Sequence, residues 1–134
     1  MKKILVPMII GVVFMLTPIL AIGASVTGSV QGFMCVTQGK VCPIGQEDNV
    51  AAVENVFVLL VDAAKGSYYF APNVDRAVMA RHINQQIKIE GTVNEKTKSI
   101  KASAIYAGDK KVWSVDLEDD IYKSLLGDLP LKGR

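Results

Sequence analysis

The sequence has one histidine and one tryptophan in 134 residues, and aromatic residues make up only 7% of it. It contains no phosphate-binding loop, no nucleophile elbow and no recognisable metal-ligand spacing. The histidine, His82, has no nucleophile or acid beside it in a spacing typical of a catalytic pair, and at the end of an expected helix we expect it to contact carbonyl groups or solvent. The length excludes a large enzyme. We predict no catalytic residue, no metal site and no cofactor.

The longest hydrophobic run lies at the N-terminus and sets the expected location of the protein. Two lysines precede it, and between residues 4 and 24 the only polar side chain is Thr17. A basic start, an apolar stretch and small residues at its end are typical of a secretory signal peptide. We therefore predict a signal peptide over residues 1–23, cleaved after Gly23 or after Ala24, and a periplasmic or secreted protein.

The alternative for this segment is an uncleaved membrane anchor, because its length approaches the roughly 20 residues that span a bilayer. Pro7 and Pro18 lie within it and, with the small residues at its end, favour cleavage. Removing residues 1–23 takes away two lysines and no acid, so the 15 basic residues become 13 and equal the 13 acidic ones. A balanced chain has no general affinity for phosphates, so nucleic acid is not an expected partner.

Cys35 and Cys42 are the only cysteines, with six residues between them. In an oxidising compartment we expect a structural disulfide, which would close a short loop and contribute about 2 to 3 kcal/mol. The spacing is neither the C-x-x-C of a redox pair nor the C-x-x-C-H of covalent haem. Two alternatives remain, in which the thiols exchange with other thiols or bind a metal together with His82 or acids such as Glu47.

Hydrophobic alternation predicts five strands and one helix between the third and the fourth strand. Residues 48–54 can form one or two helical turns, and Asn73 or Asp75 can cap the helix over residues 74–83. In the last strand the apolar period slips by one residue before Ile105, which predicts a bulge. The expected strands cover residues 25–36, 55–62, 67–70, 86–93 and 99–107.

This order of strands and helix resembles the five-stranded Greek-key OB barrel, in which the helix closes one end of the barrel. The segments QIKIEGTVN and SIKASAIY look like the fourth and fifth strands of many OB domains. The chain is similar to small secreted bacterial OB-fold proteins. The fold class we predict is all-β, with a barrel domain over residues 24–108.

A C-terminal extension over residues 109–134 follows the expected barrel. Leu117, Ile121 and Leu125 recur at helical spacing, and Gly127 is placed to end the helix. We predict a short amphipathic helix that packs its apolar stripe on the outside of the barrel, and a frayed tail after it. The alternative is that the stripe contacts a partner.

The resemblance to OB domains implies a ligand site on strands two and three and on the loops between strands one and two and between strands four and five. The candidate residues are three consecutive aromatics and two lysines of the last loop. At least one of the three aromatics must point away from the core. These candidates are Tyr68, Tyr69, Phe70, Lys96 and Lys98.

From these observations we expect an exported, non-catalytic OB-fold module that recognises a protein or a small ligand. Its site would combine the barrel face with the loop braced by Cys35 and Cys42. The first alternative is a redox or metal accessory protein of the cell envelope that uses the two cysteines. The second is an oligonucleotide-binding OB domain, in which aromatic side chains stack on bases.

Overall fold

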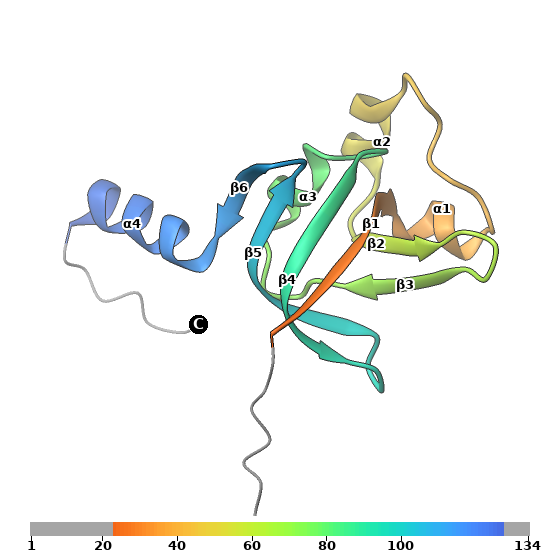
Figure 1. Cartoon of the computed structure of the whole chain (residues 1–134). Helices are drawn as coiled ribbons and strands as arrows, with labels where there is room; N and C mark the ends of the chain where they lie inside the picture. Colours follow the sequence, from red (N-terminus) through yellow and green to blue (C-terminus); the bar gives the residue numbers. More distant parts are fainter. Residues whose placement is uncertain (1–22, 128–134) are drawn as a thin grey trace, which may run out of the picture.

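The structure is a computed structural model and describes residues 23–127. The predicted signal peptide up to residue 22 and the tail from residue 128 lie outside the described residues. Within residues 23–127, no helix is both long enough and apolar enough to cross a bilayer. The elements follow one another as β1 (Ala24–Gly32), α1 (Phe33–Thr37), α2 (Glu47–Val53), β2 (Phe57–Asp62), β3 (Ser67–Phe70), α3 (Arg76–Ala80), β4 (Gln86–Asn94), β5 (Ser99–Ala107), β6 (Lys110–Ser114) and α4 (Val115–Leu126) (Figure 1).

Five of these strands close into a barrel. β1 pairs antiparallel with both β2 and β4, β2 pairs with β3, and β4 pairs with β5. A parallel pairing of β3 with β5, at Phe70 and Ser99, completes the ring. With α3 between β3 and β4, this is the strand and helix order of an OB-like barrel. The predicted all-β fold class is confirmed.

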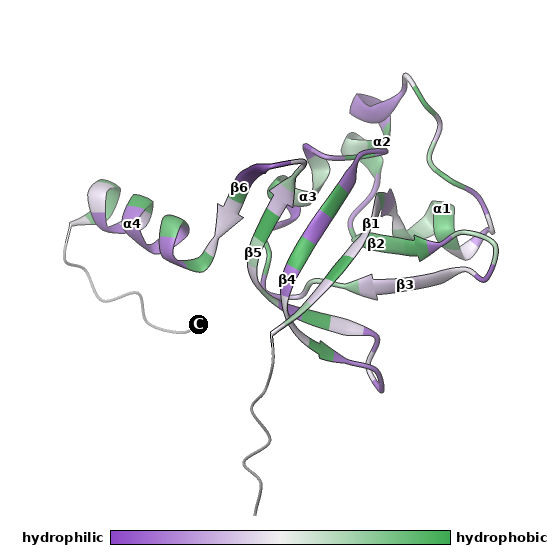
Figure 2. Ribbon diagram, viewed as in Figure 1, coloured by the Kyte–Doolittle hydropathy of each residue, from purple (hydrophilic) through white to green (hydrophobic). Residues whose placement is uncertain are grey.

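Alternate residues of the strands fill the barrel. Hydrophobic and hydrophilic residues alternate along β4 (Figure 2), where Ile87 and Ile89 point inward and are 1% and 0% exposed. Met79 from α3 is also buried in this core. Burying a side chain of this size contributes roughly 1.5–3 kcal/mol. The core therefore follows directly from the period-two pattern of the sequence.

The bulge predicted in the last barrel strand is present in β5. The register against β4 shifts between Ala102 and Ala104, so that Ser103 has no residue directly opposite. Ile105 then points into the barrel and is fully buried. Gly91 in β4 lies so close to β5 that a β-carbon there would collide with a backbone carbonyl oxygen. The bulge and the glycine together allow the two strands to bend tightly around the core.

Two predicted boundaries are wrong. The first strand ends at Gly32, and residues up to Val36 belong to α1. The helix α3 has only five residues, because the chain after it bonds to β1: Ile83 forms a parallel bridge with Val30, and the Val30 N–H donates to the Gln85 carbonyl at 3.0 Å. The short helix predicted over residues 48–54 is confirmed as α2.

The sheet continues past the predicted domain end, because β6 forms a hairpin with β5. Its last residue, Ser114, caps α4 by accepting from the Leu117 N–H at 3.2 Å. Gly127 ends α4 at a φ of 67°, as predicted. The apolar stripe of this helix is 44–73% exposed, so the expectation that it packs on the barrel is wrong (Figure 1). The stripe consists of Leu117, Ile121 and Leu125.

Candidate functional site

The outer face of β2 and β3, where OB domains bind ligands, is covered in this protein by α1. Tyr68 and Phe70 point to this face, and their rings lie 5.8 and 5.4 Å from the ring of Phe33 in α1. Val58 and Leu60 of β2 are buried beneath them, 0% and 7% exposed. The structure thus brings these two candidate aromatics together in a second hydrophobic cluster, and it leaves them half-buried.

The third candidate aromatic, Tyr69, points to the opposite side and meets the β4–β5 turn. Its hydroxyl donates to Glu95 Oε1 at 2.6 Å, and Lys98 Nζ lies 2.9 Å from Glu95 Oε2 and 5.4 Å from the centre of the Tyr69 ring. Donation from Lys98 and Tyr69 lowers the pKa of Glu95, while the carboxylate raises the pKa of both donors. Lys98 is paired with an acid in this way, whereas Lys96 is exposed on the same turn.

The structure places Cys35 and Cys42 side by side as free thiols. Their Sγ atoms are 2.6 Å apart, which is longer than the S–S bond of about 2.05 Å. The expected disulfide is therefore not formed in this structure, although the sequence correctly predicted that the cysteines are neighbours. Cys42 is fully buried, and Cys35, in α1, is half-buried. Burial and the bond with Cys35 raise the pKa of Cys42 to about 12.

A carboxylate that the sequence analysis missed lies beside these thiols. Glu54 is only 4% exposed, and its Oε1 accepts from the Met34 N–H at 3.1 Å and lies 4.0 Å from Cys35 Sγ. It stabilises the first turn of α1, which has no side-chain cap from its own preceding residue. The signal for this role was the one charged residue in a largely apolar stretch, AAVENVFVLL.

Gln31 and Gly32 at the end of β1 hold Cys42 in place. The Cys42 N–H donates to Gln31 Oε1 at 2.6 Å, and the Gly32 N–H donates to Cys42 Sγ at 3.0 Å. Gln31 is itself 2% exposed and also donates to Asn84 after α3. We call the group of Gln31, Gly32, Cys35, Cys42 and Glu54 the thiol cluster. It joins the end of β1, the helix α1 and the end of α2 at one place.

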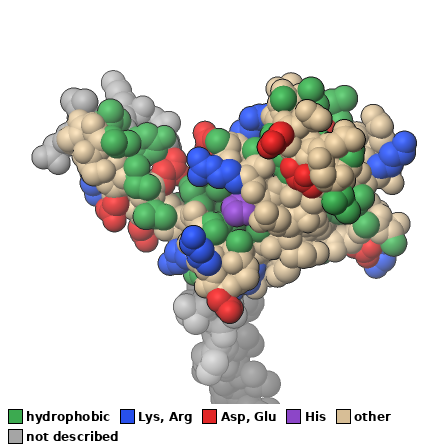
Figure 3. Space-filling model, turned by 90° about the horizontal axis from the view of Figure 1, so that it is seen from above, with side chains coloured by type: hydrophobic (Ala, Val, Ile, Leu, Met, Phe, Trp, Pro, Cys, Tyr) green, Lys and Arg blue, Asp and Glu red, His purple; other side chains and the backbone are tan. Residues whose placement is uncertain are grey.

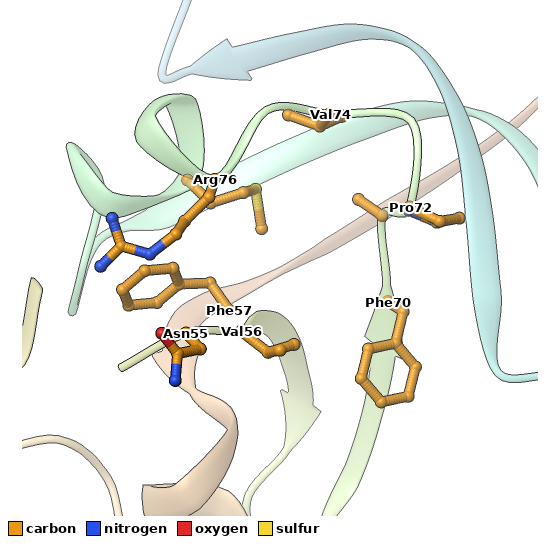
Figure 4. Close-up of a pocket in the computed structure, with 9 residues that line it drawn as sticks. Asn55, Val56, Phe57, Phe70, Pro72, Val74 and Arg76 are labelled. Carbon is orange, nitrogen blue, oxygen red and sulfur yellow. The ribbon is translucent and has the colours of Figure 1, made fainter. Parts of the chain in front are cut away.

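An apolar pocket adjoins the thiol cluster (Figure 4). It has a volume of about 410 Å³ and lies between the start of β2, the end of β3 and α3. Arg76 extends across the Phe57 ring, with 5.4 Å from Cζ to the ring centre, and donates to the backbone carbonyl groups of Glu54 and Ala51. The lining residues are Asn55, Val56, Phe57, Phe70, Ala71, Pro72, Val74, Arg76 and Met79.

The two residues considered for metal binding with the cysteines each contact a side-chain amide. His82 Nδ1 is 2.9 Å from Gln85 Oε1, and Glu47 accepts from Asn84 Nδ2 at 2.9 Å. That hydrogen bond lowers the pKa of Glu47. Within residues 23–127, no three histidine, cysteine or acidic side chains come close enough to hold a metal ion.

The fold and this site define an OB-like β-barrel with a dithiol next to an apolar pocket. Comparison of the chain with protein-family models, with curated proteins and with solved structures gives no match.

Proposed function

We propose that this protein is an exported, non-catalytic binding module. The observation that carries the proposal is the apolar pocket, because ligand pockets typically measure about 300–1,000 Å³ and are lined mainly by hydrophobic side chains. It lies beside β2 and β3, next to the outer face of these strands, which OB domains use for recognition and which α1 covers here. Phe57 and Phe70 offer rings to an aromatic or aliphatic group, and the guanidinium of Arg76 adds positive charge at the edge (Figure 4). The ligand we infer is a small apolar molecule or an apolar side chain of a partner protein.

A fluorescent probe tests the pocket. We expect 8-anilinonaphthalene-1-sulfonate to bind saturably to the wild type, since it combines apolar rings with a negative charge. Val56 lines the pocket and Val61 lies in β2 outside it, and both are 43% exposed. The Val56→Trp variant is expected to bind the probe at least about tenfold more weakly than the wild type, while the matched Val61→Trp variant binds unchanged. Equal binding by all three proteins, or no saturable binding by the wild type, contradicts the proposal.

Export and bracing of the loop belong to the same proposal. In an oxidising compartment, the adjacent thiols of Cys35 and Cys42 would join and fix the segment between them against the barrel. Sequencing the N-terminus of protein recovered from outside the cytoplasm tests the export. Mature protein that begins at Ala24 or Ser25 supports it, and a chain that keeps residues 1–23 in the membrane supports the anchor instead.

A further inference from the structure

The thiol cluster has an asymmetry that a purely structural disulfide does not need. Cys35 is half-buried and reaches the surface from the first turn of α1, whereas Cys42 lies fully buried directly behind it, with 2.6 Å between the two sulfurs. A buried carboxylate, Glu54, stands 4.0 Å from the outer sulfur. The Gly32 N–H points at the inner sulfur from 3.0 Å. Each thiol therefore has its own polar partner within the fold.

We propose that Cys35 and Cys42 form a thiol–disulfide exchange site, with Cys35 as the attacking thiol and Cys42 as the resolving thiol. The substrate class is a disulfide on a polypeptide with apolar side chains around the cysteines. The inference is independent of the apolar pocket. It concerns a covalent reaction at the sulfurs, whereas the proposed binding function concerns a ligand held between β2, β3 and α3.

The reaction balances as a two-electron exchange. Cys35 passes its proton to the Glu54 carboxylate, and its thiolate attacks one sulfur of the substrate disulfide, which breaks the substrate S–S bond. The first substrate thiolate leaves and takes the proton from Glu54. Cys42 then attacks Cys35 Sγ, the mixed disulfide breaks, and the second substrate thiolate takes the proton that Cys42 gives up. The two protein thiols become one disulfide, and the substrate disulfide becomes two thiols.

The division of roles follows from access and from charge. An incoming disulfide can reach Cys35 at the surface, but it cannot reach Cys42, which is 0% exposed. Burial also disfavours the charged form of Cys42, so little of it is thiolate at neutral pH, and it can resolve the mixed disulfide because its sulfur lies next to that of Cys35. The Gly32 N–H is placed to stabilise its thiolate when it forms.

Exposed apolar side chains around the thiols indicate the kind of substrate. Met34 precedes Cys35 and is 58% exposed, Val41 precedes Cys42 and is 53% exposed, and Ile44 and Val53 are 85% and 71% exposed. Figure 3 views the molecule from above, on the side of α2, and shows hydrophobic side chains exposed on this face among charged ones. An apolar rim of this kind favours polypeptide over glutathione.

Trapping of the mixed disulfide tests the proposal. Reduced full-length protein is mixed with one of three disulfide substrates. The first is oxidised glutathione, and the other two are disulfide-linked dimers of a short peptide whose cysteine is flanked either by leucine and valine or by serine. The products are identified by mass. We expect the wild type to end as an internal disulfide and Cys42→Ser to stop as a mixed disulfide on Cys35. The matched Cys35→Ser variant is expected to react at least about tenfold more slowly, because only the buried thiol remains.

Each outcome decides one part of the proposal. Mixed disulfide on Cys42→Ser, fastest with the leucine–valine peptide, supports it. Equal rates for Cys35→Ser and Cys42→Ser contradict the assignment of roles, and a wild type that stays a dithiol contradicts the exchange site. If oxidised glutathione reacts as fast as the apolar peptide, the polypeptide substrate is wrong. The trapping experiment does not depend on whether Val56→Trp weakens binding of the fluorescent probe. Failure of the exchange site can therefore be distinguished from failure of the proposed binding function.

The proton transfer has its own test. Glu54→Gln keeps an oxygen that can accept from the Met34 N–H, so the fold of α1 is retained. We expect its attack on the peptide disulfide to be at least about tenfold slower at neutral pH, with the loss disappearing at high pH, where the thiolate forms without help. A loss of equal size at every pH indicates a structural role only, and an unchanged or faster rate contradicts proton transfer to Glu54.

Discussion

The contact between Gly32 and Glu54 gives a sharp test of how the thiol cluster is built. A β-carbon added at Gly32 would lie 2.6 Å from the carboxyl carbon and from Oε1 of Glu54. The backbone at Gly32 has φ −65° and ψ 138°, which alanine adopts without strain. The cost of Gly32→Ala is therefore the displacement of one buried carboxylate and not a change of backbone conformation.

The size of this cost follows from what Glu54 loses. Moving its carboxylate breaks a hydrogen bond from the Met34 N–H to a charged group, worth about 1.5–3 kcal/mol, in a site only 4% exposed. The added methyl also overpacks the junction of β1 and α1, which typically costs about 1–3 kcal/mol. We expect Gly32→Ala to lower the free energy of unfolding by about 3 kcal/mol, a large part of the roughly 5–15 kcal/mol of a small domain.

Urea unfolding under reducing conditions measures this loss. The single tryptophan, Trp113, is 5% exposed, so its fluorescence reports the transition. The control is the same substitution in a Glu54→Ala protein, where nothing remains for the methyl to displace. There we expect Gly32→Ala to cost less than about 1 kcal/mol. If the cost is the same on both backgrounds, Gly32 matters for a reason other than Glu54, and the reasoning is refuted.

Four further predictions concern other parts of the fold. Asn73→Ala should cost about 2 kcal/mol in urea unfolding, because its side chain exchanges two hydrogen bonds of 2.8 Å with the backbone of β5. Asp75→Ala should cost about 1 kcal/mol in the same assay, because it removes the side-chain cap of α3. Glu95→Gln should lower the pKa of Tyr69 toward its ordinary value, as measured by tyrosinate absorbance. The free energy of unfolding of the reduced protein should fall as the pH rises from about 9 to about 12, because Cys42 loses its proton at a lower pH in the unfolded chain than in the folded protein. The Cys42→Ser variant should lack the part of this decrease that Cys42 causes.

The barrel was predictable because the hydrophobic pattern of each strand can be recognised in that strand's own sequence. The alternation of Ile87, Ile89 and Gly91 against polar neighbours has the period of a half-buried strand, and the slip before Ile105 marked the bulge. These features depend on local spacing and on burial against a single core. Within the candidate site, the adjacency of the two cysteines also followed from their short separation in the sequence.

The parts that sequence reasoning missed are those set by distant contacts. Residues Phe33–Thr37 continue an apolar pattern and include β-branched side chains, so nothing local distinguishes a helix from a strand. The helix forms because Glu54, about twenty residues later, accepts from its first turn and because Phe33 packs on Tyr68 and Phe70. In the same way β6 forms by pairing with β5, and its five residues, which begin with two lysines, give a weak strand signal.

The position of α1 decides where a ligand can bind. Val36, Val58 and Leu60 are 8%, 0% and 7% exposed because α1 covers the outer face of β2 and β3. Uncovering that face would expose all three, at roughly 1.5–3 kcal/mol for each side chain, and would also break the bond from Met34 to Glu54. Both losses arise whether the thiols are free or joined. A ligand that needs the open face of an OB barrel must overcome this cost, whereas one that enters the neighbouring pocket between β2, β3 and α3 does not, so the pocket is the favoured site in either redox state.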